Sequence, residues 1–291
     1  MTDNRSKDQV NQSADNKRSA FVVAQEVFYL LLITSLSVAA TVRVEPEVEQ
    51  VVGITRESIS SWGFLVVFAA MTAFVLFILK SVRGTKLIGA MFAFAVLAGV
   101  GSLFSHYLGS GAGILAFVIA AIIYYSNPHV LAFNIVLSFG LAGVSASVGF
   151  GFKPMALLVV MACLSVYDVV AVYFTRHMVK IARTMLRRKV FFAMILPERF
   201  IDCNVRIGDV SFSRGFAFLG TGDLVLPALF SVSVASTHGL SASLPVILGS
   251  VFGLVLTNAL FMWQKIRRPM PALPPIVLGC IIGYLIMIVT M

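Results

Sequence analysis

The chain of 291 residues is 59% apolar and 12% charged, whereas an ordinary soluble domain has about a quarter charged residues. Its mean hydropathy is +0.95, and apolar runs recur from Phe21 to Thr290, which excludes a soluble globular protein. The runs stay apolar over roughly 17 to 23 residues, so they predict membrane-spanning helices and not the short alternating strands of a membrane barrel. The net charge of +9 does not indicate nucleic-acid binding, because the basic residues lie in short loops beside these runs.

The apolar pattern predicts an all-α polytopic membrane protein with nine transmembrane helices. In chain order they are expected at residues 21–42, 62–79, 87–107, 110–126, 130–150, 155–175, 215–236, 240–262 and 271–290. Only a glycine-rich stretch, Gly109 to Gly113, separates the third and fourth spans, and fusing them would leave eight. Glycines spaced four apart, at 249 and 253 and at 279 and 283, indicate close packing between helices.

The basic residues are distributed unequally between alternate loops. Nineteen of the 22 Lys and Arg residues lie on one side of the predicted membrane, and the positive-inside rule makes that side cytosolic. The N-terminus is therefore expected in the cytosol and the C-terminus outside. The predicted organisation is a disordered cytosolic tail (1–20), helices one to six (21–175), a basic cytosolic loop (176–214) and helices seven to nine (215–291).

One apolar run, Val190 to Leu196, lies inside the basic loop. It is too short to span a membrane, so it is expected to form either an interfacial helix or a strand. Functionally it either gates a site or only connects the two spans around it.

Two aspartates, Asp168 and Asp223, lie inside predicted spans. Each costs about 2.5 to 3.5 kcal/mol at a membrane centre, and no Lys or Arg lies within 155–175 or 215–262 to pair with them. By contrast, Glu26 is close enough to the start of its span to reach the headgroups, which indicates an interfacial position. Asp168 and Asp223 each stand eight residues from the same membrane face, at a depth of about 12 Å on a helix.

Two facing carboxyls at low dielectric share one proton and titrate as a coupled pair. An aspartic protease needs this state, because one carboxylate activates a water while the other carboxyl protonates the scissile carbonyl oxygen. The alternative is a proton- or sodium-coupled secondary transporter, in which paired aspartates bind the coupling ion. Such transporters usually contain internal repeats, and neither aspartate motif has a second copy in this sequence.

Three motifs lie around these positions: Tyr167-Asp168, Gly220-Thr221-Gly222-Asp223 and Pro271-Ala272-Leu273-Pro274. In this order, on the sixth, seventh and ninth spans, they resemble the presenilin and signal-peptide-peptidase family of intramembrane aspartyl proteases. The resemblance implies that Asp168 and Asp223 are the catalytic pair. It also implies that the active site is shaped by Tyr167, Gly220, Gly222, Pro271, Ala272 and Leu273. Gly208-Asp209 is not a further copy, because it lacks the preceding glycine.

The expected partners follow from the same resemblance. They are transmembrane protein substrates within the lipid bilayer, and no nucleic acid. The cytosolic N-terminus resembles presenilins and not signal peptide peptidases, and the short loops resemble prokaryotic members, which implies the cell membrane. Prepilin peptidases also use a GxGD motif, but they follow it with a basic residue, whereas Leu224 is apolar. No cofactor and no metal are expected, since the four His and three Cys lack ligand spacing.

Overall fold

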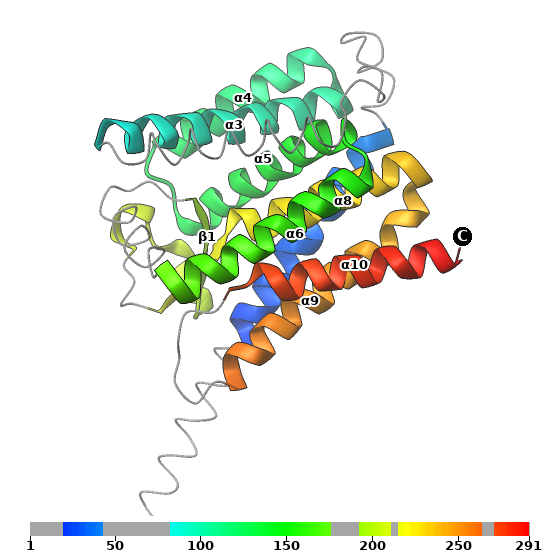
Figure 1. Cartoon of the computed structure of the whole chain (residues 1–291). Coiled ribbons are helices and arrows are strands. Elements are labelled where there is room, and N and C mark those ends of the chain that lie inside the picture. Colours follow the sequence, from blue (N-terminus) through cyan, green and yellow to red (C-terminus); the bar gives the residue numbers. More distant parts are fainter. Residues whose placement is uncertain (1–19, 43–81, 176–191, 211–214, 264–270, 291) are drawn as a thin grey trace, which may run out of the picture.

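The computed structural model describes residues 20–42, 82–175, 192–210, 215–263 and 271–290 (Figure 1). An N-terminal helix, Ala20–Val42, is followed by α3 (Val82–Leu108), α4 (Ser110–Tyr125), α5 (Val130–Phe150), α6 (Pro154–Val170), α8 (Thr221–His238), α9 (Ser243–Trp263) and α10 (Leu273–Thr290). Within these ranges, six helices are long and apolar enough to cross a membrane, and α4 is a shorter apolar helix. The predicted second span, 62–79, and the tail 1–19 lie outside the described residues.

The predicted break between the third and fourth spans is confirmed. Helix α3 ends at Leu108, α4 begins at Ser110, and Gly109 between them has a φ angle of 90°. This left-handed conformation is readily accessible to glycine, so the chain can turn here within a single residue. The two spans are therefore separate helices.

The seventh span differs from the prediction. Helix α8 begins at Thr221 and not at 215, because Phe216–Gly220 form a strand, β2. This strand pairs antiparallel with β1, Ala193–Pro197, in a register that sets Ile195 opposite Phe218. The expectation of an all-helical membrane protein holds for the helices described above, and a small two-stranded sheet accompanies them.

The apolar run in the basic loop forms strand β1 from Ala193 onward and is buried there, while Val190 and Phe191 lie outside the described residues. Met194, Ile195 and Leu196 have no exposed surface. The side chain of Asn134 on α5, itself 1% exposed, bonds the backbone of Ile195 twice, as a donor to its carbonyl at 2.6 Å and an acceptor from its N–H at 3.2 Å. This amide occupies the edge of β1 opposite to β2 and fixes the sheet against the helices.

The helices form successive layers in which α8 is central (Figure 1). Helix α3 packs on α4 and α5, α5 packs on α8, and α8 also contacts α6, α9 and α10. Helices α9 and α10 approach closely at their glycines, where a Cβ at Gly253 would lie 2.6 Å from the backbone of Ile276. The glycine spacing therefore predicted this close packing correctly.

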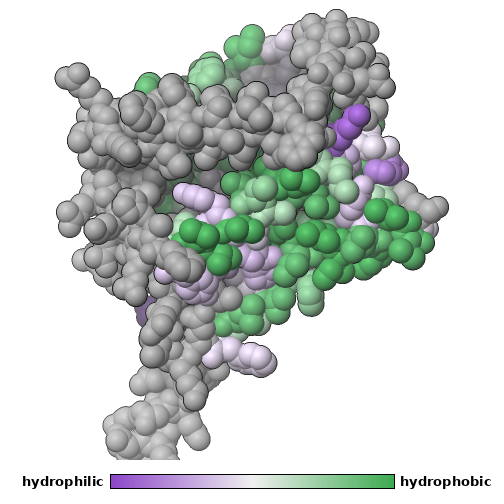
Figure 2. Space-filling view, viewed as in Figure 1, coloured by the Kyte–Doolittle hydropathy of each residue, from purple (hydrophilic) through white to green (hydrophobic). Residues whose placement is uncertain are grey.

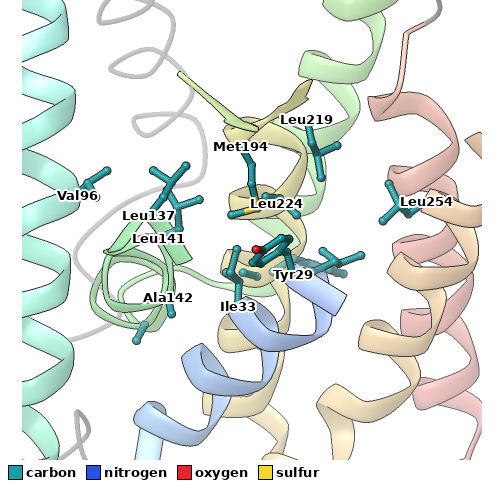
Figure 3. Packing of buried hydrophobic residues seen from close by; sticks show 14 of the residues in the cluster. Tyr29, Ile33, Val96, Leu137, Leu141, Ala142, Met194, Leu219, Leu224 and Leu254 are labelled. Carbon is teal, nitrogen blue, oxygen red and sulfur yellow. The ribbon is translucent and has the colours of Figure 1, made fainter. Parts of the chain in front are cut away.

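A continuous apolar core joins the N-terminal helix to the strands and to α8. Tyr29 and Ile33 of this helix belong to one buried cluster with Met194 of β1, Leu219 of β2 and Leu224 of α8 (Figure 3). On the outside, α6 and α10 present apolar side chains to their surroundings, as expected of helices that face lipid (Figure 2). The exposed residues include Met155, Val159, Leu278, Ile282 and Leu285.

Candidate active site

Asp168 lies near the end of α6, which then continues as a π-helical turn, Ala171–Thr175. Its carboxyl is partly buried, and Oδ2 accepts a hydrogen bond from the backbone N–H of Leu273 at 3.3 Å. The backbone N–H of Ala272 is a second donor close to the same carboxyl. Asp168 therefore caps the N-terminus of α10, where backbone donors have no partner within the helix.

This contact gives the proline motif a physical role. The first turn of α10 contains Pro274 and Pro275, which have no N–H, so Leu273 is one of the few donors left at this helix end. Pro271 is buried, and the Ala272 carbonyl accepts a bond from the Thr257 hydroxyl of α9 at 3.4 Å. The segment ahead of α10 is thus held in place while its N–H groups point at Asp168.

Asp223 lies in the first turn of α8, directly after strand β2. Helix α6 packs on both α8 and α10, which brings the two predicted aspartates to the same end of the bundle. Their carboxyls are close enough to interact electrostatically, and Asp223 also interacts with Glu26. The junction before Asp223 is fixed by Thr221, whose N–H and hydroxyl both donate to the carbonyl of Phe192, at 3.2 and 3.1 Å.

The two glycines of the GxGD motif have different surroundings. A Cβ at Gly220 would lie 3.0 Å from Oδ2 of Asp223, whereas a Cβ at Gly222 would meet nothing within 4 Å. Gly220 therefore leaves space that the carboxyl of Asp223 uses. Gly222 is exposed, and a methyl group there would not crowd Asp223.

We expect Gly220→Ala to lower kcat about ten-fold, because the added methyl displaces the Asp223 carboxyl from its position. Gly222→Ala is the matched control, since it adds the same methyl without touching Asp223. If a substrate backbone approaches position 222, Gly222→Ala should change KM. It should not change kcat. Steady-state cleavage of a reporter transmembrane peptide measures both constants. Equal kcat values for Gly220→Ala and wild type would contradict the crowding argument.

Glu26 is buried against other helices, which the sequence-based expectation of an interfacial position did not include. It is 8% exposed, and its Oε2 accepts a hydrogen bond from the Asn258 side chain of α9 at 2.6 Å. The neighbouring Gln25 donates to the carbonyl of Pro197, the last residue of β1, at 2.9 Å. The N-terminal helix is thus bonded to two elements beside the aspartates. No local sequence signal links Glu26 to Asn258, which is 232 residues away.

The remaining candidates are less closely engaged. Tyr167 stands next to Asp168 in the chain, but its side chain is 52% exposed. Asp209 ends a short 3-10 helix, Ile207–Asp209, in the loop and is exposed. Burial, and then the neighbouring Asp202, raise the pKa of the Cys203 thiol, so this cysteine is not a thiolate nucleophile at neutral pH. Among the residues described, no cluster of His, Cys, Asp and Glu is able to hold a metal ion.

Comparison with solved structures supports the arrangement of the helices. The chain superposes on a presenilin-family intramembrane aspartate protease with a TM-score of 0.64 and 21% identity, over 92% of this chain and 99% of the other. A second crystal form of a protein so described gives a TM-score of 0.61 and 22% identity, over 91% and 96%. These matches show a shared fold. No curated protein matches the chain in sequence.

A family model supplies the classification. The model described as "Signal-peptide peptidase, presenilin aspartyl protease" matches residues 19–291, nearly the whole chain. With the apolar helices, it identifies a multi-pass integral membrane protein, and the transporter interpretation receives no support. The chain belongs to the signal-peptide peptidase and presenilin family of aspartyl proteases.

Proposed function

We propose that this protein is an intramembrane endopeptidase that uses Asp168 and Asp223 to hydrolyse peptide bonds within the transmembrane helices of its substrates. The observation that carries the proposal is that α6 packs on both α8 and α10, so that Asp168 bonds the start of α10 and lies within electrostatic range of Asp223. Among the described residues, no Lys or Arg forms an ion pair with Asp168 or Asp223. A carboxyl pair without a cation favours acid–base chemistry over a structural ion pair.

In this mechanism a water lies between the two carboxyls. The ionised carboxylate takes a proton from the water, whose oxygen attacks the scissile carbonyl carbon, while the protonated carboxyl donates to the carbonyl oxygen. The product of this step is a tetrahedral diol. Transfer of a proton to the amide nitrogen then breaks the C–N bond and releases an amine and a carboxylic acid, with no covalent enzyme intermediate.

The contacts suggest which carboxyl starts as the base. Asp168 receives the N–H of Leu273, and a backbone donor stabilises negative charge on the oxygen that it contacts. We assign Asp168 the role of the base and Asp223 that of the acid in the first step. Because Oδ2 of Asp168 accepts the N–H of Leu273, we assign to Oδ1 the proton that is taken from water.

The two-stranded sheet offers a way to present an unwound substrate. A helical substrate hides its carbonyls in its own hydrogen bonds, and an extended segment needs replacement partners inside a membrane. Asn134 already bonds the outer edge of β1 at Ile195, so a substrate strand that joined this sheet would have to add to β2. Because β2 runs directly into the GxGD motif, that strand would lie next to Asp223.

The charge distribution supports an N-terminus in the cytosol and a C-terminus outside. Under this orientation the catalytic end of the bundle faces the cytosol, and substrates are expected to have their N-terminus outside. The test is cleavage of a reporter helix presented to liposome-reconstituted protein in both orientations, with the products identified by mass spectrometry. Preferred cutting of the N-terminus-in reporter would overturn the orientation, and absence of any cut would overturn the activity.

We expect the rate of cleavage to follow a bell-shaped dependence on pH. The reason is that the coupled pair is active only with one proton, so the rate falls when both carboxyls are protonated and when both are ionised. Initial rates with one reporter at constant lipid composition measure this profile. A rate independent of pH from acidic through neutral values would contradict the two-carboxyl mechanism.

A further inference from the structure

The catalytic end of the bundle contains a third carboxyl, that of Glu26. Glu26 lies six residues after the first residue of the N-terminal helix and is 8% exposed. Asn258 holds it through a 2.6 Å hydrogen bond to Oε2 and donates also to the carbonyl of Leu254 at 3.1 Å on its own helix. The Glu26 carboxyl is therefore fixed in position and largely shielded from solvent.

The surroundings of Glu26 belong to the proposed active site. The preceding residue, Gln25, bonds the end of β1, and Tyr29, one turn further on, shares a buried cluster with Leu224, the neighbour of Asp223 (Figure 3). Glu26 and Asp223 interact electrostatically across this contact. The N-terminal helix therefore borders the same buried cluster as α8. Asn258, which holds Glu26, follows Thr257, whose hydroxyl bonds the Ala272 carbonyl. Ala272 in turn precedes Leu273, whose N–H donates to Asp168.

The described surroundings of Glu26 contain acidic side chains and no basic one. In the part of the chain that the structure describes, α8 contributes Asp223 and α9 contributes the neutral Asn258, while the neighbouring Gln25 bonds a backbone carbonyl of β1 and Asp168 of α6 interacts with Asp223. Among these groups there is no cation that pairs with Glu26. Carboxyls that interact without a compensating cation compete for protons, so that ionisation of one opposes ionisation of the next.

We propose that Glu26, held by Asn258, is a positioning residue of the catalytic centre that acts through Asp223 and sets the upper pH limit of the singly protonated pair. The inference rests on the proposed function of Asp168 and Asp223. Glu26 does not contact the reacting atoms in this scheme. Its negative charge favours retention of the shared proton, and the pair therefore stays active to higher pH than it would without this neighbour.

The test is the pH profile of Glu26→Gln in the full-length protein in liposomes. The glutamine amide keeps the size and an oxygen that accepts from Asn258, but it has no charge. We expect the alkaline limb of the bell to move to lower pH by about half a unit or more. Glu26→Asp, which keeps the charge, should restore the wild-type limb at least in part.

Gln25→Met is the matched control, because it removes the adjacent polar contact with Pro197 without changing any charge. It is expected to alter the rate while leaving both limbs in place. If Glu26→Gln does not fold, Asn258→Leu serves instead, and its alkaline limb should move in the same direction because Glu26 loses the donor that stabilises its charge.

The outcomes separate the two proposals. If the alkaline limb of the pH profile does not move in Glu26→Gln, or moves equally in Gln25→Met, then Glu26 is a packing residue. Either result would overturn this inference alone. Wild-type cleavage by Asp168→Asn or Asp223→Asn would overturn the proposed function instead.

Discussion

Asp168→Asn and Asp223→Asn are each expected to reduce cleavage of a reporter transmembrane helix by about a hundred- to ten-thousand-fold, the usual contribution of a positioned acid or base. Asparagine keeps the size of the side chain and an oxygen that accepts a hydrogen bond. At position 168 it can therefore still receive the N–H of Leu273. Because an amide neither takes nor donates the catalytic proton, the loss should be in kcat, with little change in KM or in folded yield. Single-turnover rates in liposomes measure the effect.

Asp209→Asn is the matched control for both substitutions. Asp209 is an aspartate of the same chain that also follows a glycine, but it is exposed in the loop. Its replacement should leave the rate within about two-fold of wild type, as is usual for exposed positions away from a site. Near-wild-type turnover by either Asp168→Asn or Asp223→Asn would show that the pair is not catalytic. A hydroxyl-containing mimic of the diol should also bind the wild-type protein more tightly than either variant.

The parts of the fold that the sequence predicted are those that depend on local pattern. Long apolar runs require helices in lipid, and a glycine such as Gly109 allows one helix to end and the next to begin. The two aspartates stood out as candidates in the sequence, because an unpaired charge in an apolar run is costly wherever the chain folds. These arguments need no knowledge of which helices are neighbours.

The strand β2 was missed because its evidence is not local. Phe216–Gly220 is apolar and continuous with α8, so it has the composition of the start of a span. It forms a strand because β1 is available as a partner and because Thr221 bonds the Phe192 carbonyl. The depth of Asp223 counted along a helix is consequently not the correct measure, since a strand rises about 3.3 Å per residue and a helix 1.5 Å.

For the same reason, the burial of Glu26 was not predicted. Its distance from the end of the span allows a side chain to reach the headgroups, and this argument considers one helix alone. In the folded protein, α9 places Asn258 beside it and α8 places Asp223 nearby. A third acid in an apolar run was the available signal, and its meaning depended on contacts between distant segments.

The second large effect concerns the packing that places α10. A Cβ at Gly279 would lie 2.9 Å from the carbonyl carbon of Gly249 and 3.1 Å from the backbone nitrogen of Gly253. We expect Gly279→Leu to force α9 and α10 apart at a cost of about 1 to 3 kcal/mol or more, since backbone cannot move aside as a flexible side chain does.

This packing also bears on catalysis. Because α10 begins at Leu273, whose N–H donates to Asp168, Gly279→Leu should lower both the temperature of unfolding in detergent and the rate of cleavage by the folded fraction. Gly111→Leu on α4 is the control, because a Cβ there meets nothing within 4 Å and the position is exposed. It should leave both measurements close to wild type. If Gly279→Leu and Gly111→Leu lost stability equally, the loss would be due to helix propensity or expression. The close contact between α9 and α10 would then not be its cause. If Gly279→Leu lost stability but kept the wild-type rate when folded, the position of α10 would not control Asp168.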